Sequence, residues 1–149
     1  MGYYNWDTNT LEFYRRRVKV KLVFKKDKTI VKGMSGTGKS FIVSSIEGAI
    51  SASKKLSDSR VRDIFVLNKD NSYRLIDGEV KHNLVVIDRG EMVIDKELVE
   101  FINNDEDNRY LIFIRKPIGL AITPNNIAEF VSTGDSISIR YLVNQRGWN

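Results

Sequence analysis

The chain has 149 residues, of which 42% are hydrophobic, and this is enough for one packed core and one domain over residues 1–149. It has no cysteine, a single histidine, no secretory signal and no apolar run near the ~20 residues of a membrane span. Disulfides, thiolate chemistry, a multi-histidine metal site and a membrane partner are therefore not expected, and the cytoplasm is the expected compartment. The formal net charge of +5 suits a nucleic acid, an acidic partner or a polyphosphate substrate, although ordinary solvated lysines explain it as well.

The N-terminal segment 3–14 is rich in aromatic residues, namely Tyr3, Tyr4, Trp6, Phe13 and Tyr14. Asn9 and Glu12 have the spacing that caps a short helix, but a strand fits the segment too. The rings form either a platform for a nucleic-acid base or a set of side chains packed on a sheet, and we favour packing.

Residues 18–24 alternate between apolar and basic side chains, which predicts a half-buried strand. The polar stretch 25–28 is expected to turn this strand back, as a hairpin, into a strand over 29–32. The lysines on its outer face either follow a phosphodiester backbone or protect an exposed sheet edge, and we favour protection.

Residues Gly33–Ser40 read GMSGTGKS, which matches the phosphate-binding loop G-x-x-x-x-G-K-[ST] at every position. In such a loop successive backbone N–H groups surround phosphate oxygens, the lysine reaches the β- and γ-phosphates, and the hydroxyl that follows binds Mg²⁺. Lys39 and Ser40 are the residues expected to do this. The full set of expected nucleotide contacts is Gly33, Ser35, Gly36, Thr37, Gly38, Lys39, Ser40 and Phe41.

The surrounding sequence suits the motif, because such a loop leaves a strand and opens a helix. A β-branched run, Thr29–Lys32, precedes Gly33, and apolar residues recur at helical spacing after it. They predict an amphipathic helix from about Lys39 to Leu56.

The rest of the chain alternates between apolar runs and polar or helical segments, which predicts a mostly parallel sheet covered on both faces. Residues 68–83 fit either a short helix or a hairpin turn at Asp77-Gly78. Asp95 is expected to cap one helix, and Thr123-Pro124 to open a short helix through Phe130. The expected strands are 61–67, 84–87, 110–114 and 137–143.

Asp88 follows four apolar residues, Leu84–Ile87, and is expected to supply the carboxylate that a phosphate loop needs for Mg²⁺. With Gly33–Ser40 as Walker A and Leu84–Asp88 as Walker B, the chain resembles the P-loop NTPases. One strand lies between the two motifs, as in the additional-strand branch that includes the AAA+ ATPases. The resemblance implies a three-layer α/β fold, here with an added N-terminal β-hairpin, and it implies Mg²⁺ and ATP as cofactors.

The resemblance also implies that the strand Tyr110–Ile114 lies beside the phosphate-loop strand, with Arg115 at the position of a γ-phosphate sensor. An arginine departs from the small polar residue usual there, and a solvated Arg115-Lys116 pair is the alternative. A second departure follows Asp88, where the branch commonly has a glutamate that orients water. Here Arg89 and Gly90 come first, so Glu91 is the candidate for that glutamate. The expected catalytic set is Lys39, Asp88, Glu91 and Arg115.

Three functions follow from these residues. The first is a Mg²⁺-dependent ATPase or ATP-driven switch, with a role in a DNA transaction and a nucleic-acid or protein partner. The second is a small nucleoside or nucleotide kinase, because Asp88-Arg89 resembles a pair found in thymidylate kinases. Its transition state would be stabilised by an arginine clamp drawn from Arg89, Arg109, Arg115 and Arg140. The third is a nucleotide-binding module without hydrolysis, inside an oligomer or a larger assembly. GTP is disfavoured, because Asn68-Lys69-Asp70 is one residue short of the guanine-specific spacing.

Overall fold

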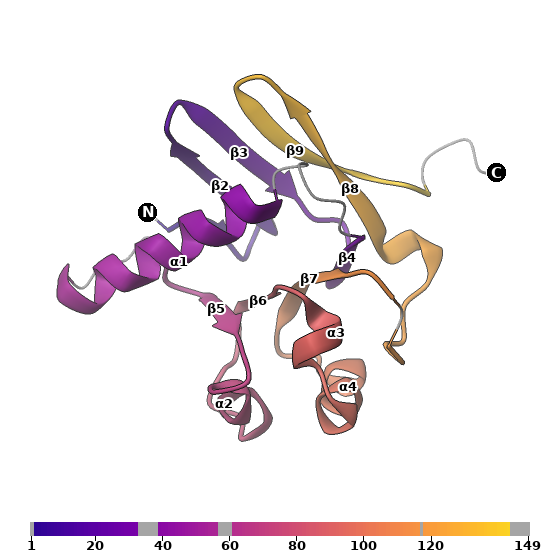
Figure 1. The fold of residues 1–149 in the computed structure, drawn as a ribbon. Coiled ribbons are helices and arrows are strands. Elements are labelled where there is room, and N and C mark those ends of the chain that lie inside the picture. The colour runs from indigo at the N-terminus through magenta and orange to yellow at the C-terminus, as the bar shows by residue number, and fades with distance from the viewer. Residues whose placement is uncertain (1, 33–38, 57–60, 117, 144–149) are drawn as a thin grey trace.

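The computed structural model describes residues 2–32, 39–56, 61–116 and 118–143, with residue 39 and residues 50–56 described by their backbone alone. Within these residues all strands belong to one nine-stranded mixed sheet of order β1-β2-β3-β9-β8-β4-β7-β6-β5 (Figure 1). The strands are β1 (Tyr4–Asn5), β2 (Thr10–Arg15), β3 (Val18–Val23), β4 (Lys28–Lys32), β5 (Ile64–Leu67), β6 (Leu84–Ile87), β7 (Arg109–Ile114), β8 (Ile127–Thr133) and β9 (Ser136–Tyr141). The helices are α1 (Lys39–Leu56), α2 (Ser72–Ile76), α3 (Gly90–Val93) and α4 (Lys96–Asn104), with a 3-10 turn η2 (Pro124–Asn126).

The sheet has a parallel half and an antiparallel half. Strand β4 pairs in parallel with β7 on one side and β8 on the other, and β6 and β5 extend the parallel half beyond β7. β6 is buried at all four positions, as expected for a strand covered on both faces. The antiparallel half consists of the pairs β1–β2, β2–β3 and β8–β9. A short parallel contact between β3 and β9 connects its two parts, and the pairing of β8 with β4 joins it to the parallel half.

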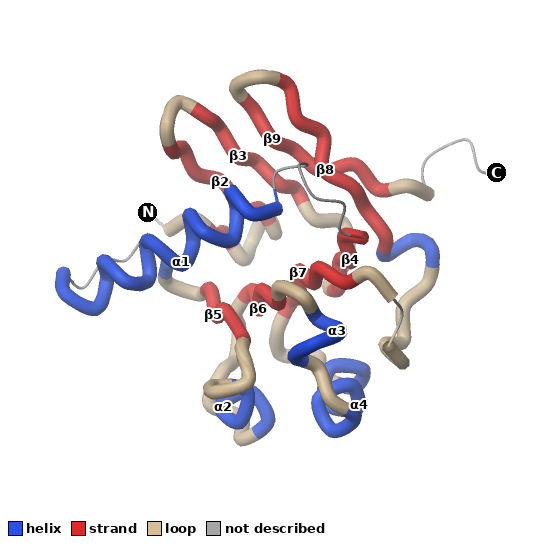
Figure 2. The backbone as a smooth tube through the Cα atoms, in the orientation of Figure 1, coloured by secondary structure: helices blue, strands red, loops and turns tan. Residues whose placement is uncertain are grey.

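The sheet is strongly curved, and its two halves face each other across α1 (Figures 1 and 2). Three residues of α1, Ile42, Val43 and Ile46, share one core with inward residues of β2 and β3 and of β6 and β7. A second core on the opposite face joins the parallel strands to α2 and to α4, which contributes Leu98 and Ile102. The parallel strands are therefore covered by one helix and the antiparallel half of their own sheet on one face, and by short helices on the other.

The prediction of a three-layer, mostly parallel fold is therefore wrong. It treated the N- and C-terminal alternating strands as additions to the edge of a helix-covered sheet. They instead continue the same sheet and curl over α1, because their inward residues, such as Leu11 and Leu22, are fully buried against that helix. Burying one apolar face against the nearest apolar surface decides this arrangement.

The expected hairpin between 18–24 and 29–32 is also wrong. β3 pairs with β2 and β9, whereas β4 lies between β7 and β8. The connection is held away from β3: the Phe24 N–H donates to the Asn9 carbonyl (2.9 Å), and the Lys25 N–H donates to the Tyr141 hydroxyl (3.0 Å). The N-terminal hairpin is instead β2–β3, joined by the two-residue turn Arg16-Arg17.

The expected helix over 123–130 reduces to one 3-10 turn. Thr123 and Asn126 form a reciprocal capping box around Pro124, so the expected start is confirmed. The Asn126 side chain then donates to the Lys28 carbonyl (2.8 Å), and Ile127 pairs with Ile30 of β4. The backbone of β4 offers these residues a ladder of hydrogen bonds, and the chain becomes strand β8 instead.

Other local predictions are confirmed. α1 spans Lys39–Leu56, and the Asp95 carboxylate accepts from the Leu98 N–H (2.9 Å) to cap α4. The aromatic N-terminal segment forms strands whose rings pack: Tyr4 is buried, and the rings of Tyr3 and Phe13 stack at 4.7 Å. Residues 68–83 contain the short helix α2, which ends before Gly78. The backbone of Gly78 is left-handed (φ +84).

Candidate functional site

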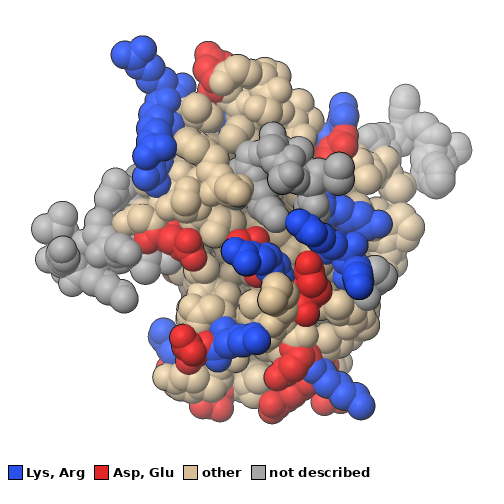
Figure 3. Space-filling view, in the orientation of Figure 1, with Lys and Arg blue, Asp and Glu red and all other residues tan. Residues whose placement is uncertain are grey.

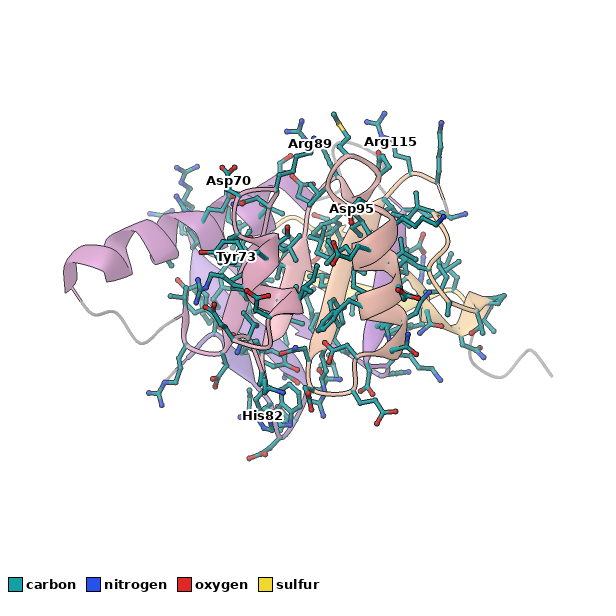
Figure 4. All side chains as sticks on the ribbon, turned by 90° about the horizontal axis from the view of Figure 1, so that it is seen from below. Asp70, Tyr73, His82, Arg89, Asp95 and Arg115 are labelled. Atoms are coloured by element: carbon teal, nitrogen blue, oxygen red, sulfur yellow. The ribbon has the colours of Figure 1, made fainter. Side chains whose placement is uncertain are left out.

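Strands β4, β5, β6 and β7 are parallel, so all four end at one edge of the sheet, which we call the carboxyl edge. The register pairs Lys32 with Ile114 and Ile87 with Ile112. β4 and β7 therefore end level with each other, and β6 ends level with a residue just before the end of β7. Figure 4 shows Asp70, Arg89 and Arg115 at this edge, with His82 at the opposite one. The carboxyl edge is where open parallel sheets place their ligands.

Asp88 is the first residue after β6. Its side chain is 31% exposed, and its Oδ2 lies 4.0 Å from the Arg89 Nε. The four buried residues of β6 hold the backbone that precedes it. The carboxylate expected from the sequence is therefore at the edge of the sheet, partly shielded from solvent and beside an arginine.

The chain turns sharply after Asp88. Arg89 has a left-handed backbone (φ 52, ψ 56) and caps the short helix α3. Gly90 follows, and a Cβ added to it would lie 2.4 Å from the Ile114 Cγ2 and 3.2 Å from the Ile112 Cγ2. Only glycine allows α3 to pack this closely on β7, so Gly90 fixes where the next residue projects.

Glu91 is brought to Arg115 by this turn. Its Oε1 accepts a hydrogen bond from the backbone N–H of Arg115 at 3.3 Å. Arg115 follows β7, and β7 lies between β6 and β4. The carboxylate of Glu91 therefore lies at the end of β7, beside β4, the strand that leads into the phosphate-loop motif. Two of the expected catalytic residues, Glu91 and Arg115, are thus in direct contact.

The phosphate-loop residues themselves fall mostly outside the described part of the chain. Gly33, Ser35, Gly36, Thr37 and Gly38 lie there, as does the side chain of Lys39, whose backbone begins α1. Ser40 is exposed in the first turn of that helix.

Phe41 differs from the other expected nucleotide contacts. Its ring is partly buried and packs against the core under α1. Its carbonyl accepts from the hydroxyl of Ser45 (2.6 Å). Its ring and its carbonyl are therefore engaged within the protein.

The carboxyl edge is basic. Exposed cations follow or end three of its strands, and Figure 3 shows Lys and Arg side chains gathered across the middle of the face toward the viewer, with acidic ones between them. Lys32 and Lys116 were not expected as site residues. Lys32 is the last residue of one apolar strand run and Lys116 is the second residue after another, and these positions were the signal that could have found them. The residues are Lys32, Arg89, Arg115 and Lys116.

The loop after β5 uses its polar side chains to hold itself. The Asn68 Oδ1 accepts from the N–H groups of Asp70 (2.8 Å) and Asn71 (3.0 Å), and the Asn71 side chain bonds back to Asn68 and Val66. Asn68 is therefore occupied by the loop itself and does not project toward a base.

The opposite edge, where the parallel strands begin, carries a second cluster of polar and aromatic groups. Arg109, the first residue of β7, donates to the Trp6 carbonyl (2.6 Å) and the Tyr4 hydroxyl (3.3 Å), and its guanidinium lies 3.9 Å from the Trp6 ring centre. The Trp6 ring also stacks on His82, with ring centres 3.9 Å apart. Burial raises the pKa of Tyr4.

The arginine clamp considered for a kinase is not assembled. Arg109 is at the opposite edge from Arg89 and Arg115, and Arg140 is ion-paired with Glu129 across β8 and β9. Residues 124–133 form η2 and β8, in the region where a kinase would need a mobile lid.

No family model, curated protein or solved structure matches this chain. Among the described residues, none of the helices combines the length and the apolar character needed to cross a bilayer. In the same residues, no three His, Cys, Asp or Glu side chains come together as a metal site.

Proposed function

We propose that the chain binds Mg²⁺·ATP at the carboxyl edge and acts as an ATPase or an ATP-driven switch. The observation that carries this proposal is the position of the GMSGTGKS segment: β4 ends at Lys32, directly before it, and α1 begins at Lys39, within it. Strand, glycine-rich segment and helix follow one another as phosphate binding requires.

The sheet supports the proposal through two features that the resemblance to P-loop NTPases implied. β6, which directly precedes the proposed Walker B acid Asp88, is third in chain order among the parallel strands that begin with β4. β7 lies between β6 and β4, as expected for the additional strand. Asp88 therefore shares an edge with the end of β4, separated from it by one strand.

The donor groups suit Mg²⁺. This cation prefers oxygen ligands, and it is commonly held by one or two protein oxygens together with phosphate oxygens and water. Ser40 would supply a hydroxyl and Asp88 a carboxylate. The ion supplies neutralisation of the charge that develops on the phosphates during transfer.

Glu91 is the residue proposed to orient water. Its Oε1 is held by the Arg115 N–H, which fixes the carboxylate at the end of β7, beside the strand that leads into the phosphate loop. Arg115 and Arg89 project from the same edge and are suited to stabilise charge on a γ-phosphate. This arrangement favours hydrolysis over the non-hydrolysing alternative. The dispersal of Arg109 and Arg140 disfavours the kinase.

Titration calorimetry with ATP, with and without Mg²⁺, tests binding, with GTP as the competitor that should bind more weakly. Lys39→Ala should abolish binding, because the ammonium that reaches the β- and γ-phosphates is lost. Lys25→Ala is the matched control: it removes the same charge from an exposed site before β4 begins, at the other edge of the sheet. Wild-type protein that binds no nucleotide, or a Lys39→Ala variant that binds as well as Lys25→Ala, would overturn the proposal.

Phosphate release then separates turnover from binding. Glu91→Gln should lower kcat by about 10²–10³ with little change in the Kd for Mg²⁺·ATP, because it removes the water-orienting oxygen and keeps the shape. Asp88→Asn should weaken the Mg²⁺ dependence of binding. A wild type that binds Mg²⁺·ATP but releases no phosphate above background would be a nucleotide-binding module, and equal release by the wild type and Glu91→Gln would remove Glu91 from catalysis. The proposal assigns the protein to the cytoplasm, because ATP is supplied there.

A further inference from the structure

The β2–β3 hairpin ends in an unusual turn, which we call the arginine turn (Arg16 and Arg17). Arg15 pairs with Val18, so the turn has two residues, and both have positive φ (53 and 67). A two-residue turn with both residues left-handed normally carries Asn-Gly or Gly-Gly, because other side chains are strained there. Two arginines in this conformation are poor choices for stability and therefore point to a use for their side chains.

The ribbon that carries the turn is strongly basic. Residues 10–23 contain five basic residues and one acidic residue, Glu12. Figure 3 shows a column of Lys and Arg side chains at the upper left, where Figure 1 has β2 and β3. Glu12 is paired with Lys19 at 3.7 Å. In the part of the chain that the structure describes, no carboxylate forms an ion pair with Arg16 or Arg17, and both side chains are exposed.

The turn is anchored to the body of the protein by its neighbour. Arg15 lies on the inner face of the ribbon, and its Nη1 donates to the Ser44 carbonyl of α1 at 3.3 Å. On the other side, the Lys19 N–H donates to the Asp135 carbonyl of the β8–β9 turn at 2.9 Å. The arginine turn is therefore held in place, which lowers the entropy lost when it binds a partner.

From these observations we propose that the arginine turn binds the phosphodiester backbone of duplex DNA. Guanidinium groups match phosphate geometry in a bidentate manner, and a duplex offers one negative charge per ~1.7 Å of its axis. Binding of single-stranded DNA would require a row of exposed aromatic rings on which its bases stack. This ribbon exposes one, Tyr14 (67%), while Phe13 is buried in the core. The turn also lacks the apolar side chains that insert into a lipid surface. This inference does not depend on nucleotide binding.

The decisive variant is Arg16→Asn/Arg17→Gly, which removes both charges and installs residues that suit the turn. Anisotropy of a labelled DNA duplex is measured over about 50 to about 200 mM salt, and thermal unfolding is measured on the same samples. We expect a Tm equal to or above that of the wild type. We expect duplex affinity to fall about ten- to a hundredfold at the low-salt end, and the slope of log K against log salt to lose about 1.8, since each phosphate contact contributes about 0.9.

The matched control is Lys25→Ala/Lys26→Ala, which removes the same charge from exposed residues beyond the far end of β3. It should lose much less affinity. The proposal is overturned if the wild type does not bind duplex, if the two variants lose the same affinity, or if the single strand binds as tightly as the duplex with the same dependence on the turn. Anionic phosphatidylserine vesicles are the remaining arm: binding that depends on the turn there, and not with DNA, would make the surface a membrane contact.

Discussion

The two edges of the parallel strands hold similar residue types and differ in what these residues do. At the edge where the strands begin, Arg109 is bonded to Trp6 and Tyr4 and is 21% exposed. At the edge where they end, Arg115 is exposed, and its backbone N–H donates to Glu91. The two arginines lie at opposite ends of the same strand, β7. Charges whose partners lie within the protein stabilise the fold, whereas charges that project from strand ends are available to a ligand.

Arg109→Ala should have the largest effect on stability. It removes two hydrogen bonds and a cation–π contact from a partly buried site, and we expect a loss of about 2–3 kcal/mol in the free energy of unfolding. Urea denaturation measures this loss, and calorimetry on the folded variant should give an unchanged Kd for Mg²⁺·ATP. A loss of nucleotide binding with unchanged stability would reverse the distinction between the edges.

Gly90→Ala should cost about 1–3 kcal/mol, because its Cβ would collide with Ile114 and force α3 away from β7. The displacement also moves Glu91, so ATP turnover should fall together with stability. Gly48→Ala is the control: it lies in α1, where its Cβ meets only the end of the flexible Arg15 side chain at 3.3 Å. Alanine there should raise stability by up to about 1 kcal/mol. Equal effects of the two changes would remove close packing as the reason for Gly90.

Tyr110→Phe tests a second side chain at the edge where the strands begin. The Tyr110 hydroxyl donates to the Asp105 Oδ2 at 2.6 Å, and burial, followed by this bond, raises the pKa of Tyr110 above its ordinary value. The unfolded chain therefore releases this proton first, so stability is full below pH ~10 and falls as pH rises above it.

The variant should lose about 1 kcal/mol at neutral pH and show a shallower decline in alkali. Unfolding free energies measured from pH ~7 to ~11 give both quantities. A residual decline is expected from Tyr4, whose pKa burial also raises. An alkaline decline as steep as that of the wild type would show that Tyr110 does not contribute to it.

Arg115→Ala should have the smallest effect on stability, within about 0.5 kcal/mol, because its side chain is exposed. Its effect should appear instead in the kcat for ATP, if the guanidinium faces the γ-phosphate. The same urea and phosphate-release measurements used for Arg109→Ala make the pair a direct comparison. A destabilisation as large as that of Arg109→Ala would show that both ends of β7 are structural.

Local pattern alone was sufficient for several elements. The helical spacing of Ile42, Val43 and Ile46 predicted α1, the Asp95 cap predicted α4, and the apolar runs predicted β6 and β7. These features depend on a residue's near neighbours, which the sequence contains directly. For the same reason Asp88 could be expected at the end of a buried strand.

Tertiary structure decided which surfaces meet. Residues 127–130 became part of β8 because β4 offered them hydrogen-bond partners. For the same reason β3 pairs with β9, and not with β4 as the sequence predicted. The contact between Glu91 and Arg115 depends on how closely Gly90 packs on Ile114, which no spacing in the sequence shows. Periodicity records which face of an element is apolar, but the partner that covers it is chosen among distant segments, and only the folded chain makes that choice.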